Sequence, residues 1–204
     1  MLWGDSVILP GVIASSGGVA SSYESIATTT VGSGGSSSVS FSSIPSTFKH
    51  LQVRVMAQTN RATYGTDGVY MTFNGDTTSG SYSWHGLKGD GANASAASLT
   101  SQNNILWNNA IATSAASVYT FGAMIIDLLD YVNTNKYKTA RSFTGHDLNG
   151  TVSGFGGAVY LQSGLWFKAG SGVTSDAISS ITFTPQVGTI FTQFSSFALY
   201  GVKA

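Results

Sequence analysis

Short runs in which apolar and polar residues alternate recur along this chain, and they constrain its fold more than any other feature. The clearest run is HLQVRVMAQ at 50–58, in which Leu51, Val53 and Val55 share one face of an extended chain. Residues that favour helices are scarce, and Glu24 is the only glutamate. The pattern predicts an all-β protein.

Strand signals recur from residue 23 to the end of the chain. Further strands are predicted at 23–31, 39–44, 68–76, 81–91, 118–131, 136–148, 154–167, 178–185 and 194–203. We expect 81–91 to pair with 68–76 as a hairpin after the turn signal Asn74-Gly75. Roughly nine or ten strands at this spacing favour an antiparallel β-sandwich, and within that class a jelly roll.

Two segments depart from the simple alternation. Residues 92–116, which begin with ANASAASLTSQNN, have no obvious strand pattern and predict either a short helix or a long loop. Residues 118–131 are apolar almost throughout, which predicts a strand that is buried on both faces or that lies at an interface.

The composition divides the 204 residues into an N-terminal arm, 1–22, and one β-domain, 23–204. The arm combines a short apolar piece with Pro-Gly and a Ser/Gly run, a composition that is flexible until something holds it. It lacks the basic start of a secretory signal, and no run of the chain is apolar enough for a transmembrane helix, so we expect neither. The residues predicted to act in assembly are Leu2, Trp3, Val7, Ile8 and Leu9.

Charge is unusually low. Charged residues make up 9% of the chain, against about 25% in an ordinary domain, and nine basic residues balance nine acidic ones. Such a surface is expected to be rich in hydroxyl groups or covered by other chains. Nucleic acid is not an expected partner, because phosphate binding needs a basic excess. The absence of cysteine excludes disulfides and thiolate metal sites.

A search for catalytic residues finds one pair of carboxylates worth naming, Asp127 and Asp130, in the most apolar segment. A polysaccharide hydrolase would need two carboxylates that converge across a cleft. The odd spacing of this pair places them on opposite faces of a regular strand. We therefore expect each of them to cap a turn or to form an ion pair with Lys136, Lys138 or Arg141, and we expect no enzymatic activity.

The remaining motifs also favour structural roles. His50, His85 and His146 are far apart in the sequence, so no metal site is predicted, and no cofactor is expected. Trp84 and Trp107 could form an exposed platform on which sugar rings stack, although tryptophans equally fill a core or an interface. The same two uses apply to the other aromatic candidates, Trp166, Tyr64 and Tyr82.

Several segments of the chain resemble a group of structural proteins from tailed bacteriophages. The resemblance runs through 22–62, 69–91, 125–143 and 194–203. Its most specific parts are SIPSTFKHLQ at 43–52 and FNGD at 73–76. Residues 1–21 lie outside it.

The resemblance implies a virion protein with a β-sandwich or jelly-roll fold and no enzymatic activity. Capsid decoration (cement) proteins, head fibres and tail components all occur in the group. We expect a decoration protein that is assembled in the host cytoplasm, forms a homotrimer and binds the major capsid protein or another virion protein through its arm, with no membrane partner. The alternative is a tail or fibre module that binds a host surface glycan through Trp84 and Trp107.

Overall fold

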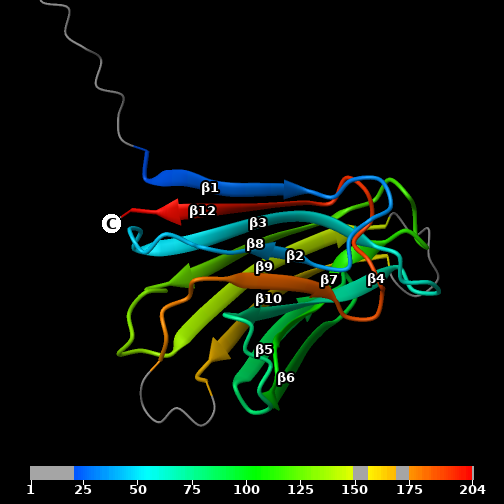
Figure 1. The fold of residues 1–204 in the computed structure, drawn as a ribbon. Helices are drawn as coiled ribbons and strands as arrows, with labels where there is room; N and C mark the ends of the chain where they lie inside the picture. The colour runs from blue at the N-terminus through cyan, green and yellow to red at the C-terminus, as the bar shows by residue number, and fades with distance from the viewer. Residues whose placement is uncertain (1–20, 149–155, 169–174, 204) are drawn as a thin grey trace, which may run out of the picture.

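A computed structural model describes residues 21–148, 156–168 and 175–203 of the protein. The described chain is all-β, as predicted, and contains no helix (Figure 1). Its strands are β1 (Tyr23–Thr30), β2 (Val39–Phe41), β3 (His50–Thr59), β4 (Thr66–Phe73), β5 (Tyr82–Gly89), β6 (Ala94–Gln102), β7 (Ile105–Thr113), β8 (Gly122–Leu129), β9 (Lys138–Asp147), β10 (Gly157–Trp166), β11 (Ile181–Pro185) and β12 (Ser196–Val202).

The strands form one mixed sheet. Its order is β2-β11-β4-β7-β3-β8-β9-β10-β5-β6, and β12 pairs with β3 on one side and with β1 on the other. All pairs are antiparallel except β3 with β7, which run parallel where Gln58 and Thr59 lie opposite Ala112 and Thr113. This short parallel pairing joins the two parts of the sheet.

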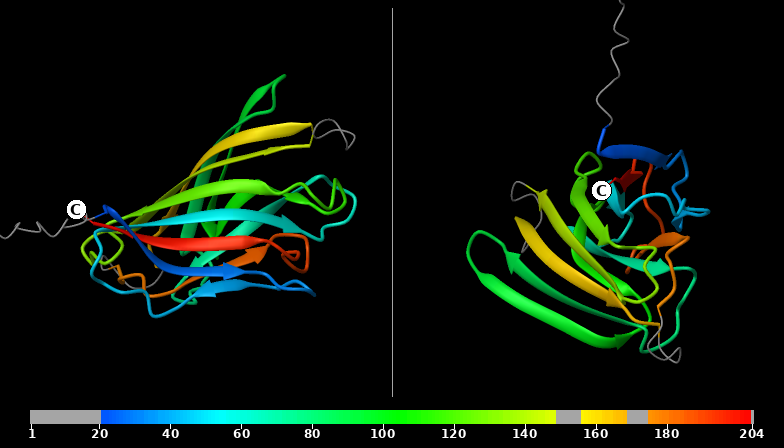
Figure 2. Two further views of the ribbon diagram at one scale, coloured as in Figure 1. Left: turned by 90° about the horizontal axis from the view of Figure 1, so that it is seen from above. Right: turned by 90° about the vertical axis from the view of Figure 1, so that its left-hand side faces the viewer.

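The sheet curves strongly, so that one part covers the inner face of the other (Figure 2). Strand β7 contacts β5, β8, β9 and β10 across the interior, although it pairs with none of them. Apolar side chains from both parts meet between them in a single core. The opposite face of β8, β9, β10 and β5 is left to solvent.

The core is filled by alternate residues of neighbouring strands. Val53 of β3 lies opposite Ile126 of β8 and Leu199 of β12, and all three are fully buried. Phe197, two residues earlier on β12, packs against Phe191 with ring centroids 4.9 Å apart. Burial of each such side chain contributes about 1.5–3 kcal/mol. The positions that face the core must therefore be apolar, and this requirement produces the alternation by which these strands are recognised in the sequence.

Two segments differ from the sequence-based expectation. Residues 92–116 form neither a helix nor a long loop, because they contain the whole of β6 and β7. Strand β8, within 118–131, is not buried on both faces, so the first of the two alternatives for this segment is wrong and the interface alternative stays a prediction. Met124, Ile126 and Leu128 are buried, whereas Ile125 between them is 44% exposed. The segment is uniformly apolar because both faces of this strand carry apolar residues, one of them toward solvent.

The predicted hairpin of 68–76 with 81–91 is wrong, although its turn is present. Asn74 and Gly75 have φ of 52° and 69°, the left-handed conformations that an Asn-Gly turn supplies. Both edges of β4 are already occupied, by β11 and by β7. The chain after the turn therefore leaves β4, and β5 pairs with β10 and β6 instead.

One buried carboxylate ties three distant segments together. The side chain of Asp67, at the start of β4, is fully buried. Its Oδ2 accepts hydrogen bonds from Thr59 Oγ1 at 2.9 Å and from the Gly188 N–H at 2.8 Å. Its Oδ1 accepts from the N–H groups of Gly68 and Val187. The carboxylate thereby fixes the loop after β11 to the junction of β3 and β4.

We expect Asp67→Asn to lower the free energy of unfolding by roughly 1–3 kcal/mol, because the amide NH₂ would place a donor against another donor. Chemical denaturation followed by tryptophan fluorescence measures the change. The control is Glu24→Gln, which removes a surface ion pair with Lys203 and should change the free energy by about 0.5 kcal/mol or less. Equal stability of the two variants would contradict this role for Asp67.

Candidate functional site

The solvent face of β5, β10, β9 and β8 carries a straight row of apolar side chains. Leu87 lies opposite Leu161, which lies opposite Phe143, which lies opposite Ile125. These four side chains, here called the apolar row, are 60%, 54%, 58% and 44% exposed in that order. Isolated exposed leucines are ordinary, but a contiguous apolar stripe on a sheet face marks an interaction surface.

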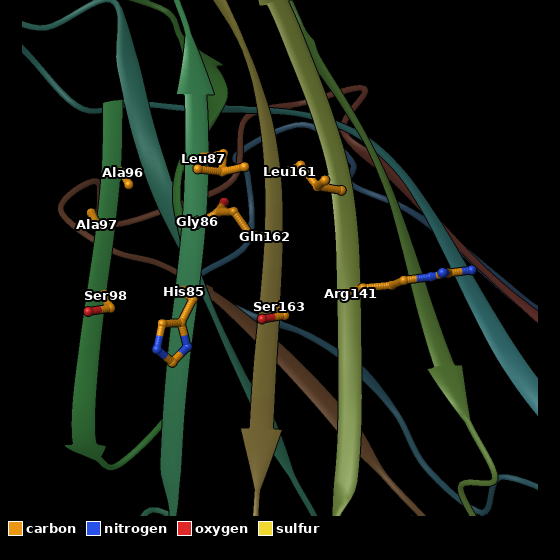
Figure 3. Close-up of a pocket in the computed structure, with 10 residues that line it drawn as sticks. All are labelled: His85, Gly86, Leu87, Ala96, Ala97, Ser98, Arg141, Leu161, Gln162 and Ser163. Atoms are coloured by element: carbon orange, nitrogen blue, oxygen red, sulfur yellow. The ribbon is translucent and has the colours of Figure 1, made fainter. Parts of the chain in front are cut away.

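A groove of about 730 Å³ lies on the same face and includes part of the apolar row (Figure 3). Its walls come from four neighbouring strands. Leu87 and Leu161 supply its apolar part, and backbone and small side chains of β6 form its far wall. The lining residues are His85, Gly86, Leu87, Ala96, Ala97, Ser98, Arg141, Leu161, Gln162 and Ser163.

A row of polar side chains runs parallel to the apolar row on the same face. On each strand that contributes to the apolar row, its residue lies two positions away from the residue of that row. Ser98, His85, Ser163, Arg141 and Asp127 lie opposite one another in that order across β6, β5, β10, β9 and β8. Arg141 Nε lies 3.2 Å from Asp127 Oδ2. The row therefore offers hydroxyl, imidazole and guanidinium groups, with its single carboxylate already paired.

The pairing of Asp127 continues toward β3. Gln52 Nε2 donates to Asp127 Oδ1 at 2.9 Å, and Arg54 Nε donates to Gln52 Oε1 at 2.8 Å. The guanidinium of Arg54 in turn lies over the ring of Tyr200, 4.7 Å from its centroid. Such a chain of hydrogen bonds holds these side chains in fixed positions on the sheet.

Asp127 and Asp130 act as ion-pair partners, as predicted. Lys136 lies 2.7 Å and Lys49 2.9 Å from Asp130 carboxylate oxygens. Hydrogen bonds from Lys136 and Lys49 lower the pKa of Asp130 to about 2. A general acid needs a raised pKa, so this carboxyl is poorly suited to that role. Lys138, the other lysine predicted as a partner, donates its hydrogen bonds to other groups.

Lys138 is held by neutral oxygens. Its Nζ donates to the carbonyls of Asn133 and Lys136 at 2.5 and 2.9 Å, and to Ser175 Oγ at 3.0 Å. Burial lowers the pKa of this ammonium group. The interaction fastens the segment at Ser175 to the turn before β9, which is a structural role.

The three histidines lie in separate environments. His50 Nδ1 accepts the Asp130 N–H at 3.0 Å, His85 lines the groove, and His146 is buried and stacked on Tyr160 with ring centroids 6.4 Å apart. Within the described residues, no three metal-binding side chains cluster.

Trp84 and Trp107 are buried, with 3% and 0% of each residue exposed. The expectation that they contact a glycan at the surface is therefore wrong. Trp84 shares the inner face of β5 with Tyr82, and Trp107 lies on β7 inside the fold. Trp166 is also buried; of the aromatic candidates only Tyr64 is substantially exposed, beneath the guanidinium of Arg61.

The predicted assembly residues of the arm lie outside the described residues. They are Leu2, Trp3, Val7, Ile8 and Leu9.

The apolar row is not among the sites predicted from the sequence. A signal for it is present, because β8 and β10 carry apolar residues at both odd and even positions. Leu161 alternates with buried Tyr160 and Gln162, so its outward direction can be deduced once the inner positions are known. Alignment of the row across strands depends on register, which no single segment reveals.

The inner side of the same strands carries an unusual set of buried polar groups. Ser142, Thr144 and His146 of β9, Gln162 of β10 and Trp84 of β5 each have a buried polar atom without a hydrogen-bond partner among the described protein atoms. We call this set the inner polar seam. A small cavity of about 60 Å³ borders Trp84 and Gln162, and such polar spaces hold bound water.

Comparisons with known proteins give no identity. No family model, no curated protein and no solved structure matches this chain. Among the described residues, no helix could cross a membrane.

Burial of His146 makes stability depend on pH. Burial lowers the pKa of this imidazole, so the unfolded chain binds more protons than the folded chain just below pH 6.5. We expect the free energy of unfolding to fall as the pH is lowered from 7 to 5, and to fall less in His146→Phe. The control is His85→Phe, which makes the same substitution at an exposed position. If His146→Phe shows the same pH dependence as the wild type, the burial of His146 is not its cause.

Proposed function

We propose that this protein is a non-enzymatic virion structural protein of a tailed bacteriophage, a capsid decoration protein that assembles with copies of itself and with the major capsid protein. The observation that carries the proposal is the apolar row. The same proposal includes a β-sandwich of jelly-roll type, with strands that are antiparallel apart from the short β3–β7 pairing, and a homotrimer located in the virion.

The apolar row favours a protein that works while covered by another chain. Full burial of a leucine or phenylalanine contributes about 1.5–3 kcal/mol, so covering the exposed half of each of the four side chains contributes about 1 kcal/mol. Charged side chains interrupt an exposed sheet face in most freely dissolved proteins, but only 9% of this chain is charged. Both features suit a subunit of a permanent assembly.

The polar chemistry of the described residues supports a structural role as well. The two carboxylates considered for catalysis are engaged by Arg141 and by the pair Lys49 and Lys136. The resemblance of residues 22–62, 69–91, 125–143 and 194–203 to structural proteins of tailed bacteriophages is the reason for proposing a phage particle as the partner. The arm supplies a second apolar segment in Leu2, Trp3, Val7, Ile8 and Leu9.

A tail or fibre module that binds host surface glycan is the second candidate. The groove favours it, because hydroxyl and charged groups of Ser98, His85 and Arg141 stand beside the apolar surface of Leu87 and Leu161. Sugars are commonly bound by such mixed surfaces. Buried Trp84 and Trp107 cannot provide the stacking platform, so any sugar contact would lie in the groove.

The decisive measurement is the number of copies of this chain in purified particles, determined by quantitative mass spectrometry against the major capsid protein. We expect hundreds of copies, near parity with the capsid protein. A few to a few dozen copies would move the protein to the tail or a vertex and favour the glycan-binding candidate. Absence from particles would overturn both.

Deletion of residues 1–21 should leave the fold intact and abolish binding to particles that lack the protein, because the arm is proposed to carry the capsid contact. Rebinding is measured by co-sedimentation, and folding by circular dichroism. Phe143→Ser tests the apolar row in the same assay and should weaken binding without loss of fold. The arm assignment fails if the truncated protein still decorates the particles.

A further inference from the structure

Strand β6 is an open edge of the sheet. It pairs only with β5, so the hydrogen-bonding groups along its other side have no strand partner among the described residues. Eight of its nine residues are exposed, which means that neither of its faces is covered. Figure 2 shows it as the outermost strand of the curved sheet.

The usual protections of an edge strand are missing from β6. Its sequence, ASAASLTSQ, contains no charge and no proline. Its pairing with β5 is regular from Ala94 to Leu99, and a register shift occurs only beyond that stretch. An edge of this kind is a ready template for another strand.

The other two edges of the described sheet are better protected. Strand β1 carries Glu24, which is ion-paired with Lys203, and its register shifts between Ser25 and Ala27. Strand β2 has only three residues. Of these edges, β6 therefore offers the longest uninterrupted and uncharged ladder.

The geometry points to antiparallel pairing of β6 with β6 of a second copy of this chain. This inference rests on the proposed function, because it specifies how copies associate. A second copy fits the edge because a strand without charges meets no like charge when it faces itself. The alanines at its centre also keep the two chains free of steric conflict.

The two-fold axis of such a pair stands perpendicular to the sheet, so the outer faces of both copies point the same way. Directly opposite residues of an antiparallel pair point to the same side. One residue of β6 must therefore face its own counterpart across the axis. The centre of the regular stretch places Ala96 or Ala97 there.

Pairing at β6 extends the surface proposed to bind the particle. The apolar rows of the two copies lie on one side of a continuous sheet, from β8 of one copy to β8 of its partner. Nine strand spacings separate these strands, or roughly 43 Å at 4.8 Å each. The contact is isologous, so it makes a dimer by itself or a two-fold junction between trimers.

The absence of cysteine permits a direct test with single substitutions in the full chain. Ala96→Cys and Ala97→Cys are purified separately, oxidised and analysed by non-reducing electrophoresis. We expect at least one of them to form a disulfide-linked dimer in high yield, because opposite Cα atoms in a ladder lie within disulfide range. Thr28→Cys, on the exposed part of edge strand β1, is the control and should remain monomeric.

Ala97→Lys should weaken the association of two copies, because it places two like charges close together at the centre of the β6 contact. Light scattering at tens of micromolar protein should show a smaller molar mass than wild type, whereas Thr28→Lys should keep the wild-type mass. The inference is overturned if neither cysteine variant dimerises, if Thr28→Cys dimerises equally well, or if Ala97→Lys has the wild-type mass. Circular dichroism confirms that each variant is folded.

The two proposals fail in different ways. Disulfide-linked dimers of a protein that is absent from particles would leave the β6 contact standing and remove the virion function. High copy number in particles, together with monomeric cysteine variants or cross-links only to a different protein, would keep the function and remove the β6 contact.

Discussion

The arrangement depends on β3, because this strand pairs with β12 and β8 along most of its length and with β7 at its end. The change of partner occurs at Gln58 and Thr59. Gln58 Nε2 donates to the carbonyls of Ser117 and Thr120, while Thr59 Oγ1 donates to Asp67. Hydrogen bonds from these polar side chains stabilise the point at which the two parts of the curved sheet separate. The separation leaves room for the core between the two parts.

Sequence periodicity predicts most strands because half-buried strands alternate visibly, as in β3 and β12. It misses β6 for a physical reason: a strand exposed on both faces needs no apolar residues, so ASAASLTSQ resembles a loop. Pairing is harder still to predict. The Asn74-Gly75 turn is present where the sequence predicts it, but the turn cannot reveal that β11 and β7 already flank β4.

The candidate site is less predictable than the fold. Residue type alone suggests a surface role for Trp84 and Trp107, yet their positions on inner faces bury them. The ion pairs of Asp127 and Asp130 can be anticipated because suitable cations lie nearby in the sequence. The apolar row cannot, because it exists only when the registers of β5, β10, β9 and β8 are known together.

The inner polar seam has a mechanical consequence. The inner faces of β9 and β10 carry Ser142, Thr144 and Gln162 beside core residues such as Ala140 and Trp166, whereas the inner faces of β3, β8 and β12 consist of aliphatic and aromatic side chains. A contact that contains unpaired polar groups and a small cavity resists sliding and bending less than close-packed hydrocarbon does. The sheet should therefore be stiff around β3 and compliant toward β6. In the proposed capsid role, a compliant wing on a rigid base would let the same subunit fit places of unequal curvature.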